Sequence, residues 1–188
     1  MFTNSESHYG LVSIVLHWSM ALCFIAMYAL GWWMVELDYY DPWYHRAPDI
    51  HRSVGILLAG LMLLRFLWNR LQPRPADLTD HPLLNRIARW VHNLFYLLVM
   101  LMLVTGYLIS TAKGAGIDVF DWFSVPALLP ASDERGDQAG DFHQILAHLF
   151  MALAAIHATA ALKHHFRDRN LTLVRILKTN SQQTGGNP

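Results

Sequence analysis

The chain has 188 residues, of which 54% are hydrophobic and only 15% are charged, and its mean hydropathy is +0.24. Soluble domains usually carry about 25% charged residues, so this composition indicates a membrane protein. The 14 basic and 14 acidic residues balance, which argues against a nucleic-acid-binding surface. The single cysteine, Cys23, excludes an intrachain disulfide, a cysteine-ligated zinc site and an iron–sulfur cluster.

Four long apolar segments follow one another along the chain, at about residues 11–34, 51–71, 86–111 and 142–166. Each is long enough to cross a hydrocarbon core of about 30 Å as a helix. Because lipid offers no partners for backbone polar groups, we predict that all four are helical. The sequence therefore predicts an all-α integral membrane four-helix bundle over residues 1–178, followed by a flexible cytoplasmic tail over residues 179–188.

Lysine and arginine are distributed unevenly between the two sides of this bundle. Most of them lie at or beside the connection between the second and third segments, or at and beyond the end of the fourth segment: Arg65, Arg70, Arg74, Arg86, Arg89, Lys163, Arg167, Arg169, Arg175 and Lys178. The other two connections hold only Arg46, Arg52, Lys113 and Arg135. Short loops rich in basic residues stay in the cytoplasm, so this pattern predicts a multi-pass protein with both termini cytoplasmic.

Histidines recur inside these apolar segments, where lipid provides no partner for their ring nitrogens. His143 and His157 are 14 residues apart in the stretch DFHQILAHLFMALAAIHATAALKHHF. On one helix they lie within about 40° of the same face and about 21 Å apart along the axis. His17 in the first segment matches the depth of His157, and His51 at the start of the second segment matches the depth of His143. Two pairs of rings on neighbouring helices are therefore predicted.

Such pairs suit b-type haem, because the iron needs one imidazole on each face and one helix cannot supply both. The predicted metal ligands are His17, His51, His143 and His157. Spacing alone leaves open the alternative that these rings are hydrogen-bonded packing residues. Zinc is a poorer match, since it binds ligands clustered at one level and these histidines are divided between two.

Other polar residues near the pairs are candidates for binding either the propionates of a haem or the carbonyl group of a quinone. His92 in the third segment is a candidate of this kind, and it is also an alternative partner for His157. Lys163 and His164 are further candidates, with anchoring at the membrane surface as the alternative. Arg52 and Arg65 could pair with propionates, although Arg65 could equally extend to the aqueous interface. His148 is rotated about 140° from His143 and is expected to face another helix or lipid.

The sequence resembles the bacterial cytochrome b561 family over about residues 8–178. The matching pieces are VLHW, IHRSVGILL, RWVHNLFYLL, FHQILAHLFMALAAIHATAALKHHF and RDRNLTLVRIL. This family is similar to the cytochrome b subunits of membrane hydrogenases and formate dehydrogenases. The resemblance implies two haem b groups, one held by His17 and His157 toward the cytoplasm and one by His51 and His143 toward the periplasm. It also implies ubiquinone as electron acceptor or donor.

The resemblance further implies a protein of the bacterial inner membrane that transfers electrons between the periplasmic face and the quinone pool of the respiratory chain. Oxidation of superoxide with reduction of ubiquinone is one activity of such proteins. The connection over residues 113–141 is rich in acidic and poor in basic residues, however, and an anionic substrate would prefer a positively charged approach. The alternatives are a non-catalytic relay or anchor for a periplasmic redox partner and, more distantly, a metal or proton transporter lined with histidine. Catalytic residues are not identified, and a homodimer is left open.

Overall fold

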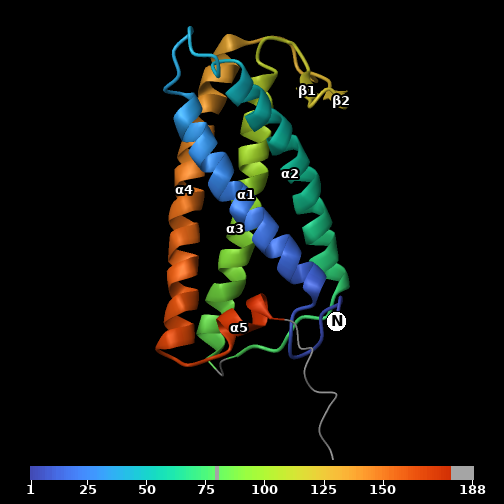
Figure 1. Cartoon of the computed structure of the whole chain (residues 1–188), viewed down its shortest axis with the longest axis vertical. Coiled ribbons are helices and arrows are strands. Elements are labelled where there is room, and N and C mark those ends of the chain that lie inside the picture. The colour runs from blue at the N-terminus through green and yellow to red at the C-terminus, as the bar shows by residue number, and fades with distance from the viewer. Residues whose placement is uncertain (79–80, 179–188) are drawn as a thin grey trace, which may run out of the picture. The chain divides into compact units, whose positions relative to one another are not determined.

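The computed structural model describes residues 1–78 and 81–178. Its elements are α1 (Leu11–Met34), α2 (Arg46–Leu71), α3 (Pro82–Ser110), β1 (Ile117–Val119), β2 (Phe123–Val125), α4 (Asp133–Phe166) and α5 (Thr172–Leu177), as Figure 1 shows. The helices α1 to α4 are each long and apolar enough to cross a membrane. The predicted all-α membrane bundle is thus confirmed, with one short β-ribbon added. The predicted tail over residues 179–188 lies outside the described residues.

Three of the long helices begin earlier than their predicted apolar segments, and the first turns of two of them, α2 and α4, are polar. α2 begins at Arg46 and α3 at Pro82. Proline suits the first position of a helix, where its missing N–H would have no partner in any case. α4 begins at Asp133, nine residues before the apolar segment predicted from residue 142.

The early start of α4 has a local cause. The Ser132 hydroxyl accepts a hydrogen bond from the backbone N–H of Arg135 at 3.3 Å, which is the contact of a helix N-cap. Asp133 and Glu134 follow in the first turn, where their negative charges interact favourably with the positive end of the helix dipole. Capping and charge therefore extend α4 beyond the region that hydropathy marks.

The chain forms two compact units, and each of the helices α1 to α4 contributes to both. Unit 1 consists of Met1–Ala21, Leu61–His92 and Ala154–Pro188, and unit 2 consists of Leu22–Gly60 and Asn93–Leu153. Each predicted histidine pair falls within a single unit. His17 and His157 belong to unit 1, whereas His51 and His143 belong to unit 2.

In unit 1 the N-terminal residues fold over the start of α1. The buried Asn4 side chain accepts hydrogen bonds from the Gly10 N–H at 2.9 Å and from the Ser13 hydroxyl at 2.7 Å. A Cβ at Gly10 would lie 2.3 Å from the carbonyl oxygen of Phe2, so only glycine fits this turn. The Asn4 N–H also donates to Gln72 at the end of α2, which fixes the segment to two helices.

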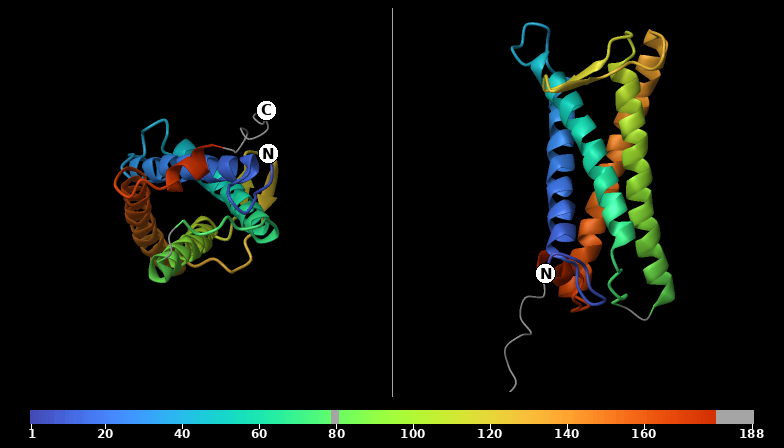
Figure 2. Two further views of the ribbon diagram at one scale, coloured as in Figure 1. Left: turned by 90° about the horizontal axis from the view of Figure 1, so that it is seen from below. Right: turned by 90° about the vertical axis from the view of Figure 1, so that its right-hand side faces the viewer.

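Unit 1 also contains the short helix α5, which lies beside the first turns of α1 (Figure 2). The indole N–H of Trp18 donates to the Ile176 carbonyl at 2.9 Å. Arg175 donates to the carbonyl of Ala76 at 2.7 Å. The chain after α4 is therefore held against α1 and the segment that follows α2.

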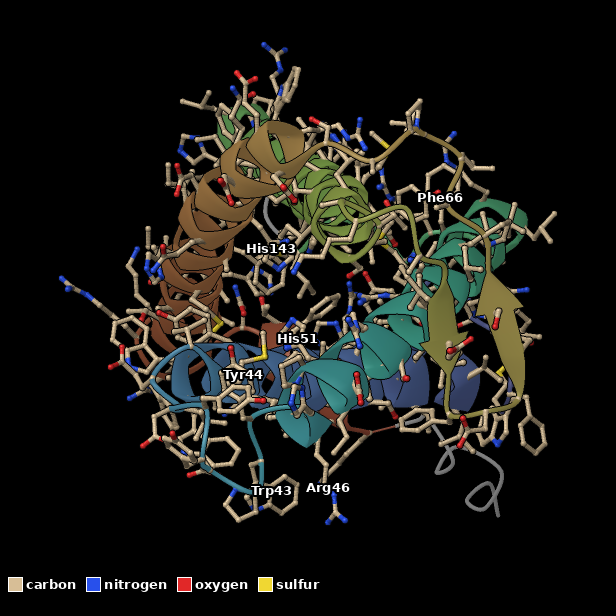
Figure 3. The ribbon with its side chains drawn as sticks, turned by 90° about the horizontal axis from the view of Figure 1, so that it is seen from above. Trp43, Tyr44, Arg46, His51, Phe66 and His143 are labelled. Atoms are coloured by element: carbon tan, nitrogen blue, oxygen red, sulfur yellow. The ribbon has the colours of Figure 1, made fainter. Side chains whose placement is uncertain are left out.

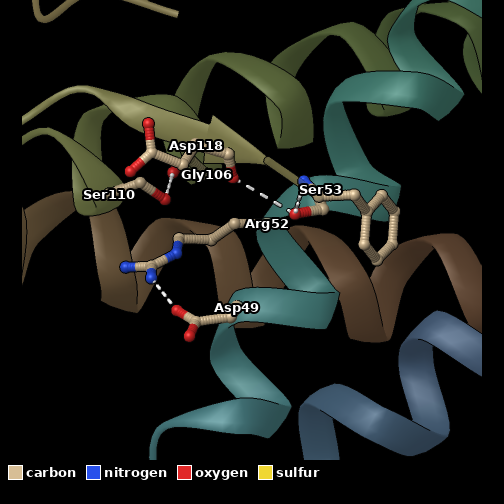
Figure 4. A network of polar contacts seen from close by, with 7 residues as sticks. Asp49, Arg52, Ser53, Gly106, Ser110 and Asp118 are labelled. Carbon is tan, nitrogen blue, oxygen red and sulfur yellow. Dashed lines mark hydrogen bonds and ion pairs between the residues drawn. The ribbon is translucent and has the colours of Figure 1, made fainter. Parts of the chain in front are cut away.

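In unit 2 the connection between α3 and α4 forms an antiparallel ribbon, in which Ile117 pairs with Val125 and Val119 with Phe123. Ser53 of α2 is only 3% exposed and joins this ribbon to the helix. Its hydroxyl donates to the Asp118 carbonyl and accepts from the Phe120 N–H, both at 3.2 Å, as Figure 4 shows in part. The ribbon is thus anchored to the first turns of α2.

We expect Ser53→Ala to loosen this ribbon, because it removes both bonds and leaves two backbone groups without their partner. Loss of about 1 kcal/mol corresponds to roughly fivefold faster local opening. Hydrogen exchange at the Phe120 amide measures this directly. Ser124→Ala is the matched control, because the Ser124 hydroxyl is exposed and contacts the Asp118 carboxylate. Equal exchange in the two variants would contradict the anchoring role of Ser53.

Candidate functional site

Unit 2 brings together the rings of His51 from α2 and His143 from α4, which both face the interior in Figure 3. Their ring centres are 6.2 Å apart and their planes are inclined by 73°. A bond between a metal and an imidazole nitrogen is about 2 Å long, so two imidazoles on opposite sides of one metal ion have ring centres about 6 Å apart. The observed separation fits a shared metal ion between the rings.

The ring of His143 is held in one tautomer by its neighbours on α3. Its Nδ1 atom lies 3.0 Å from the Met102 carbonyl oxygen and 3.1 Å from the Thr105 hydroxyl. A carbonyl oxygen can only accept, so the ring hydrogen is on Nδ1. The Nε2 atom then carries the lone pair that a metal ligand needs. A backbone carbonyl in this position is the usual means of orienting a histidine that binds metal.

The opposite ring, His51, has a buried Nδ1 atom without a hydrogen-bond partner in the part of the chain that the structure describes. Buried polar atoms are nearly always bonded, and those that are not are informative about a site. The ring of His143 is thus held by α3, whereas Nδ1 of His51 has no partner among the described residues. The two rings together can therefore bind a further group.

Two glycines allow the neighbouring helices to approach these rings closely. A Cβ at Gly31 of α1 would lie 3.2 Å from Cε1 of His51, and a Cβ at Gly106 of α3 would lie 3.3 Å from Cε1 of His143. Both distances are shorter than an ordinary van der Waals contact. Each ring is therefore packed by a backbone that carries no side chain at that point.

We expect Gly106→Ala to displace the His143 ring and weaken whatever this pair binds. The new methyl group would also lie 3.5 Å from Nδ1, the atom that donates to Met102. Haem content per chain should fall or the midpoint potential should shift, as read by optical redox titration. Gly60→Ala in α2 is the control, because a Cβ there meets nothing within 4 Å. Identical titrations of the two variants would exclude close packing at Gly106 as a requirement.

Unit 1 contains three histidines in one interior. The rings of His92 from α3 and His157 from α4 have centres 5.5 Å apart, with planes inclined by 70°. His17 of α1 belongs to the same unit. Depth along the helices predicts His17 as the partner of His157, and the structure also sets His92 beside that ring. Both remain candidates for the position opposite His157.

Arg65 of α2 contacts the His17 ring. Its Nη2 atom is 2.9 Å from Nδ1 of His17, and since arginine only donates, this nitrogen accepts. The sulfur of Met20 lies 4.0 Å from Nη1 of the same guanidinium. A positive charge is thus held beside a predicted metal ligand, on the side of α2 that faces α1 and not lipid.

The remaining predicted cofactor contacts are occupied by carboxylates in the structure. Arg52 forms an exposed ion pair with Asp49 one turn earlier (Figure 4). Lys163 and His164 both contact Asp168, at 3.9 Å and 2.6 Å. Asp168 could not be identified as a partner of these residues from the sequence, because it lies two residues beyond the end of α4. A role of Arg52, Lys163 and His164 in holding propionates or quinone stays a prediction.

The donor set also distinguishes between kinds of metal. Among residues 1–78 and 81–178 there is no group of three or more histidine, cysteine, aspartate or glutamate side chains suited to a metal ion. Tetrahedral zinc needs three or four protein ligands. Two imidazoles suffice only when the bound group brings the other ligands itself, as the porphyrin of haem does. The residues present therefore fit haem better than a bare ion.

Four helices of the described residues are long and apolar enough to span a membrane, and imidazoles from different helices are placed in pairs, which is the architecture and donor set of a b-type cytochrome. The sequence profile described as prokaryotic cytochrome b561 matches residues 8–179, and the chain belongs to this family. Family membership implies a multi-pass bacterial membrane protein that binds b-type haem, transfers electrons and interacts with quinone. The predicted family is thereby confirmed.

Three relatives cover nearly the whole chain. "Cytochrome b561 homolog 2" of Escherichia coli (strain K12) is 44% identical over 185 residues, which are 98% of each chain. "Probable superoxide oxidase CybB" of Yersinia pestis is 27% identical over 90% of this chain and 95% of its own. "Cytochrome b561 homolog 1" of Escherichia coli (strain K12) is 23% identical over 91% of this chain and 97% of its own.

Proposed function

We propose that this protein is a di-haem b cytochrome that carries electrons between the periplasmic face of the membrane and the quinone pool, with both termini in the cytoplasm. His51 and His143 would hold the haem in unit 2, and His17 and His157 the haem in unit 1. The observation that carries the proposal is the His143 ring, whose hydrogen is fixed on Nδ1 by the Met102 carbonyl, so that Nε2 is left to bind iron.

Haem supplies the redox chemistry when bound, because its iron holds one electron as it changes between ferric and ferrous states. The chain's own residues position it. Met102 and Thr105 orient the His143 ring, and Gly31 and Gly106 give the two rings of unit 2 their room. In unit 1 the Arg65 guanidinium lies within reach of the His17 ring. A positive charge near the proposed haem favours its reduced, more electron-rich state, whether or not haem binding displaces the bond to His17.

The electron donor is the open part of the proposal. A relative that is 27% identical carries the name of a superoxide oxidase, which supports superoxide as a donor. The residues expected at the periplasmic side, however, include exposed carboxylates and few cations: Glu36, Asp38, Asp49, Asp118, Asp121, Asp133, Glu134, Asp137 and Asp141. This surface repels a small anion. It favours the second candidate function, relay of electrons with a basic periplasmic partner protein.

Purified protein tests the proposal at two levels. Pyridine haemochrome analysis should find two haem b groups per chain, and one haem or none would contradict the di-haem assignment. The haem-loaded protein is then given superoxide together with a quinone analogue. Reduction of the analogue would establish the oxidase activity, whereas haems that remain oxidised under superoxide but accept electrons from a reduced partner protein would establish the relay.

A further inference from the structure

A polar cluster lies on α1 and α4 of unit 2, apart from the His51–His143 pair. The Tyr28 hydroxyl is 3.0 Å from Nδ1 of His148. The Trp32 ring centre lies 5.6 Å from that of His148, and the Tyr28 ring centre lies 5.7 Å from it. The three side chains form a continuous aromatic and polar surface one turn long on α1, which we call the Tyr28–Trp32–His148 cluster.

This cluster faces outward from the chain while lying inside the membrane-spanning segments. His148 is exposed, and Trp32 is 59% exposed. Tyr28 is six residues from the end of α1 at Met34, which places it about 9 Å along the helix from that end. Trp32 alone would be an ordinary interfacial residue. An imidazole exposed at the depth of Tyr28 is costly in lipid unless a ligand or partner bonds to it.

His148 has bonding capacity left for such a ligand. The structure shows Nδ1 bonded to Tyr28 and gives Nε2 no hydrogen bond to any described residue. When the tyrosine hydroxyl donates to Nδ1, the ring hydrogen is on Nε2, which then donates outward. The ligand that fits is an apolar molecule with a carbonyl acceptor and a planar ring, since Trp32 offers an exposed aromatic face beside the donor.

The position of the cluster relates it to electron transfer. His148 is five residues after His143 on α4, so the two rings are separated by about 7.5 Å along the helix axis and project in directions about 140° apart. A ligand bound at His148 would lie outside the bundle, reachable from lipid, yet close to the pair proposed to hold haem. A membrane quinone is a redox molecule with the required ring, carbonyl oxygens and lipid-soluble tail.

We propose that the Tyr28–Trp32–His148 cluster binds the headgroup of the membrane quinone. His148 donates from Nε2 to one quinone carbonyl, Tyr28 fixes the imidazole through Nδ1, and Trp32 packs against the quinone ring. This inference rests on the proposed function, because it names the place where that function's quinone binds. A second copy of the chain is the competing occupant of the same surface.

Photo-crosslinking of the haem-loaded protein in lipid nanodiscs with an azido-quinone tests the inference. Labelled peptides should map to residues 25–34 of α1 and 145–152 of α4. His148→Leu should weaken equilibrium binding of a short-chain quinone by roughly tenfold, and Tyr28→Phe by a few-fold, as expected for loss of one or two hydrogen bonds. Haem content should not change in either variant.

Thr159→Val is the matched control, because its hydroxyl lies on the exposed surface of α4 in unit 1 and donates only within the helix, to the Ala155 carbonyl. Its quinone affinity should equal that of the wild type. Labelling elsewhere, or unchanged affinity in His148→Leu, would overturn the inference. Conversion of a dimer to a monomer by His148→Leu would assign the surface to a second copy and overturn it as well. Haem counts that differ from two would instead refute the proposed function, so the two failures are distinguishable.

Discussion

The His51→Ala variant is expected to retain one haem per chain in place of two. His51 and His143 face each other across 6.2 Å between ring centres, and no third histidine, cysteine or carboxylate completes a ligand group there among the described residues. Alanine leaves the iron with a single protein ligand on one side, and low-spin bis-imidazole binding fails. Pyridine haemochrome analysis gives the count, and an optical redox titration should show one transition in place of two.

His45→Ala is the matched control for this experiment. His45 precedes α2 by one residue, is exposed and packs edge-on against Tyr44, so its loss should leave both haems in place. His143→Ala should remove the same haem as His51→Ala, and the double variant should resemble either single one, because residues that act as a unit are not additive. Two haems in both single variants would refute the assignment of this pair.

The depths of the histidines could be predicted from the sequence because a helix in lipid has one geometry. A spacing of 14 residues between His143 and His157 places both on one face whatever the surrounding chain does, and lipid makes any unbonded ring costly. The structure accordingly sets His51 beside His143 in unit 2. Helix periodicity and the lipid environment thus determine the level of each ring without knowledge of its contacts.

The contacts themselves could not be predicted, because they depend on how neighbouring helices are rotated. The bond from His143 to Met102 joins residues 41 positions apart, and nothing in the local sequence marks a backbone carbonyl as a partner. The close approach of Gly106 to the His143 ring could not be predicted either, because a glycine in a membrane helix often serves only to bring two helices together. Hydropathy likewise missed the polar first turns of α4, although Ser132 followed by Asp133 and Glu134 is a readable capping signal.

The role of Arg65 in unit 1 could be predicted from the sequence only in part. Arg65 was a candidate for pairing with propionates or extending to the interface, and in the structure it donates to His17. A histidine that binds iron through Nε2 carries its hydrogen on Nδ1 and cannot accept there. Haem binding at His17 would therefore release the guanidinium, which then becomes available for a charge-assisted bond to a carboxylate.

We accordingly expect His17→Ala to lose the haem of unit 1 and His92→Ala to keep it. The centres of the His92 and His157 rings are 5.5 Å apart, less than the spacing of about 6 Å for two imidazoles on one metal ion. His92 also has a hydrogen bond to the backbone of Ala88 on its own helix, a bond that by itself would suit a metal ligand equally well. In His92→Ala the midpoint potential of one haem should shift while the haem count stays at two.

Comparison of His17→Ala with His92→Ala identifies which of the two histidines is the partner of His157. Electron paramagnetic resonance of the oxidised protein adds a second readout: loss of a histidine ligand in unit 1 should remove the low-spin signal of that haem, while the signal of the haem in unit 2 remains. A haem retained in His17→Ala and lost in His92→Ala would move the ligand from α1 to α3. Arg65 would then keep its bond to His17, and the charge beside the haem would act through a histidine that does not bind iron.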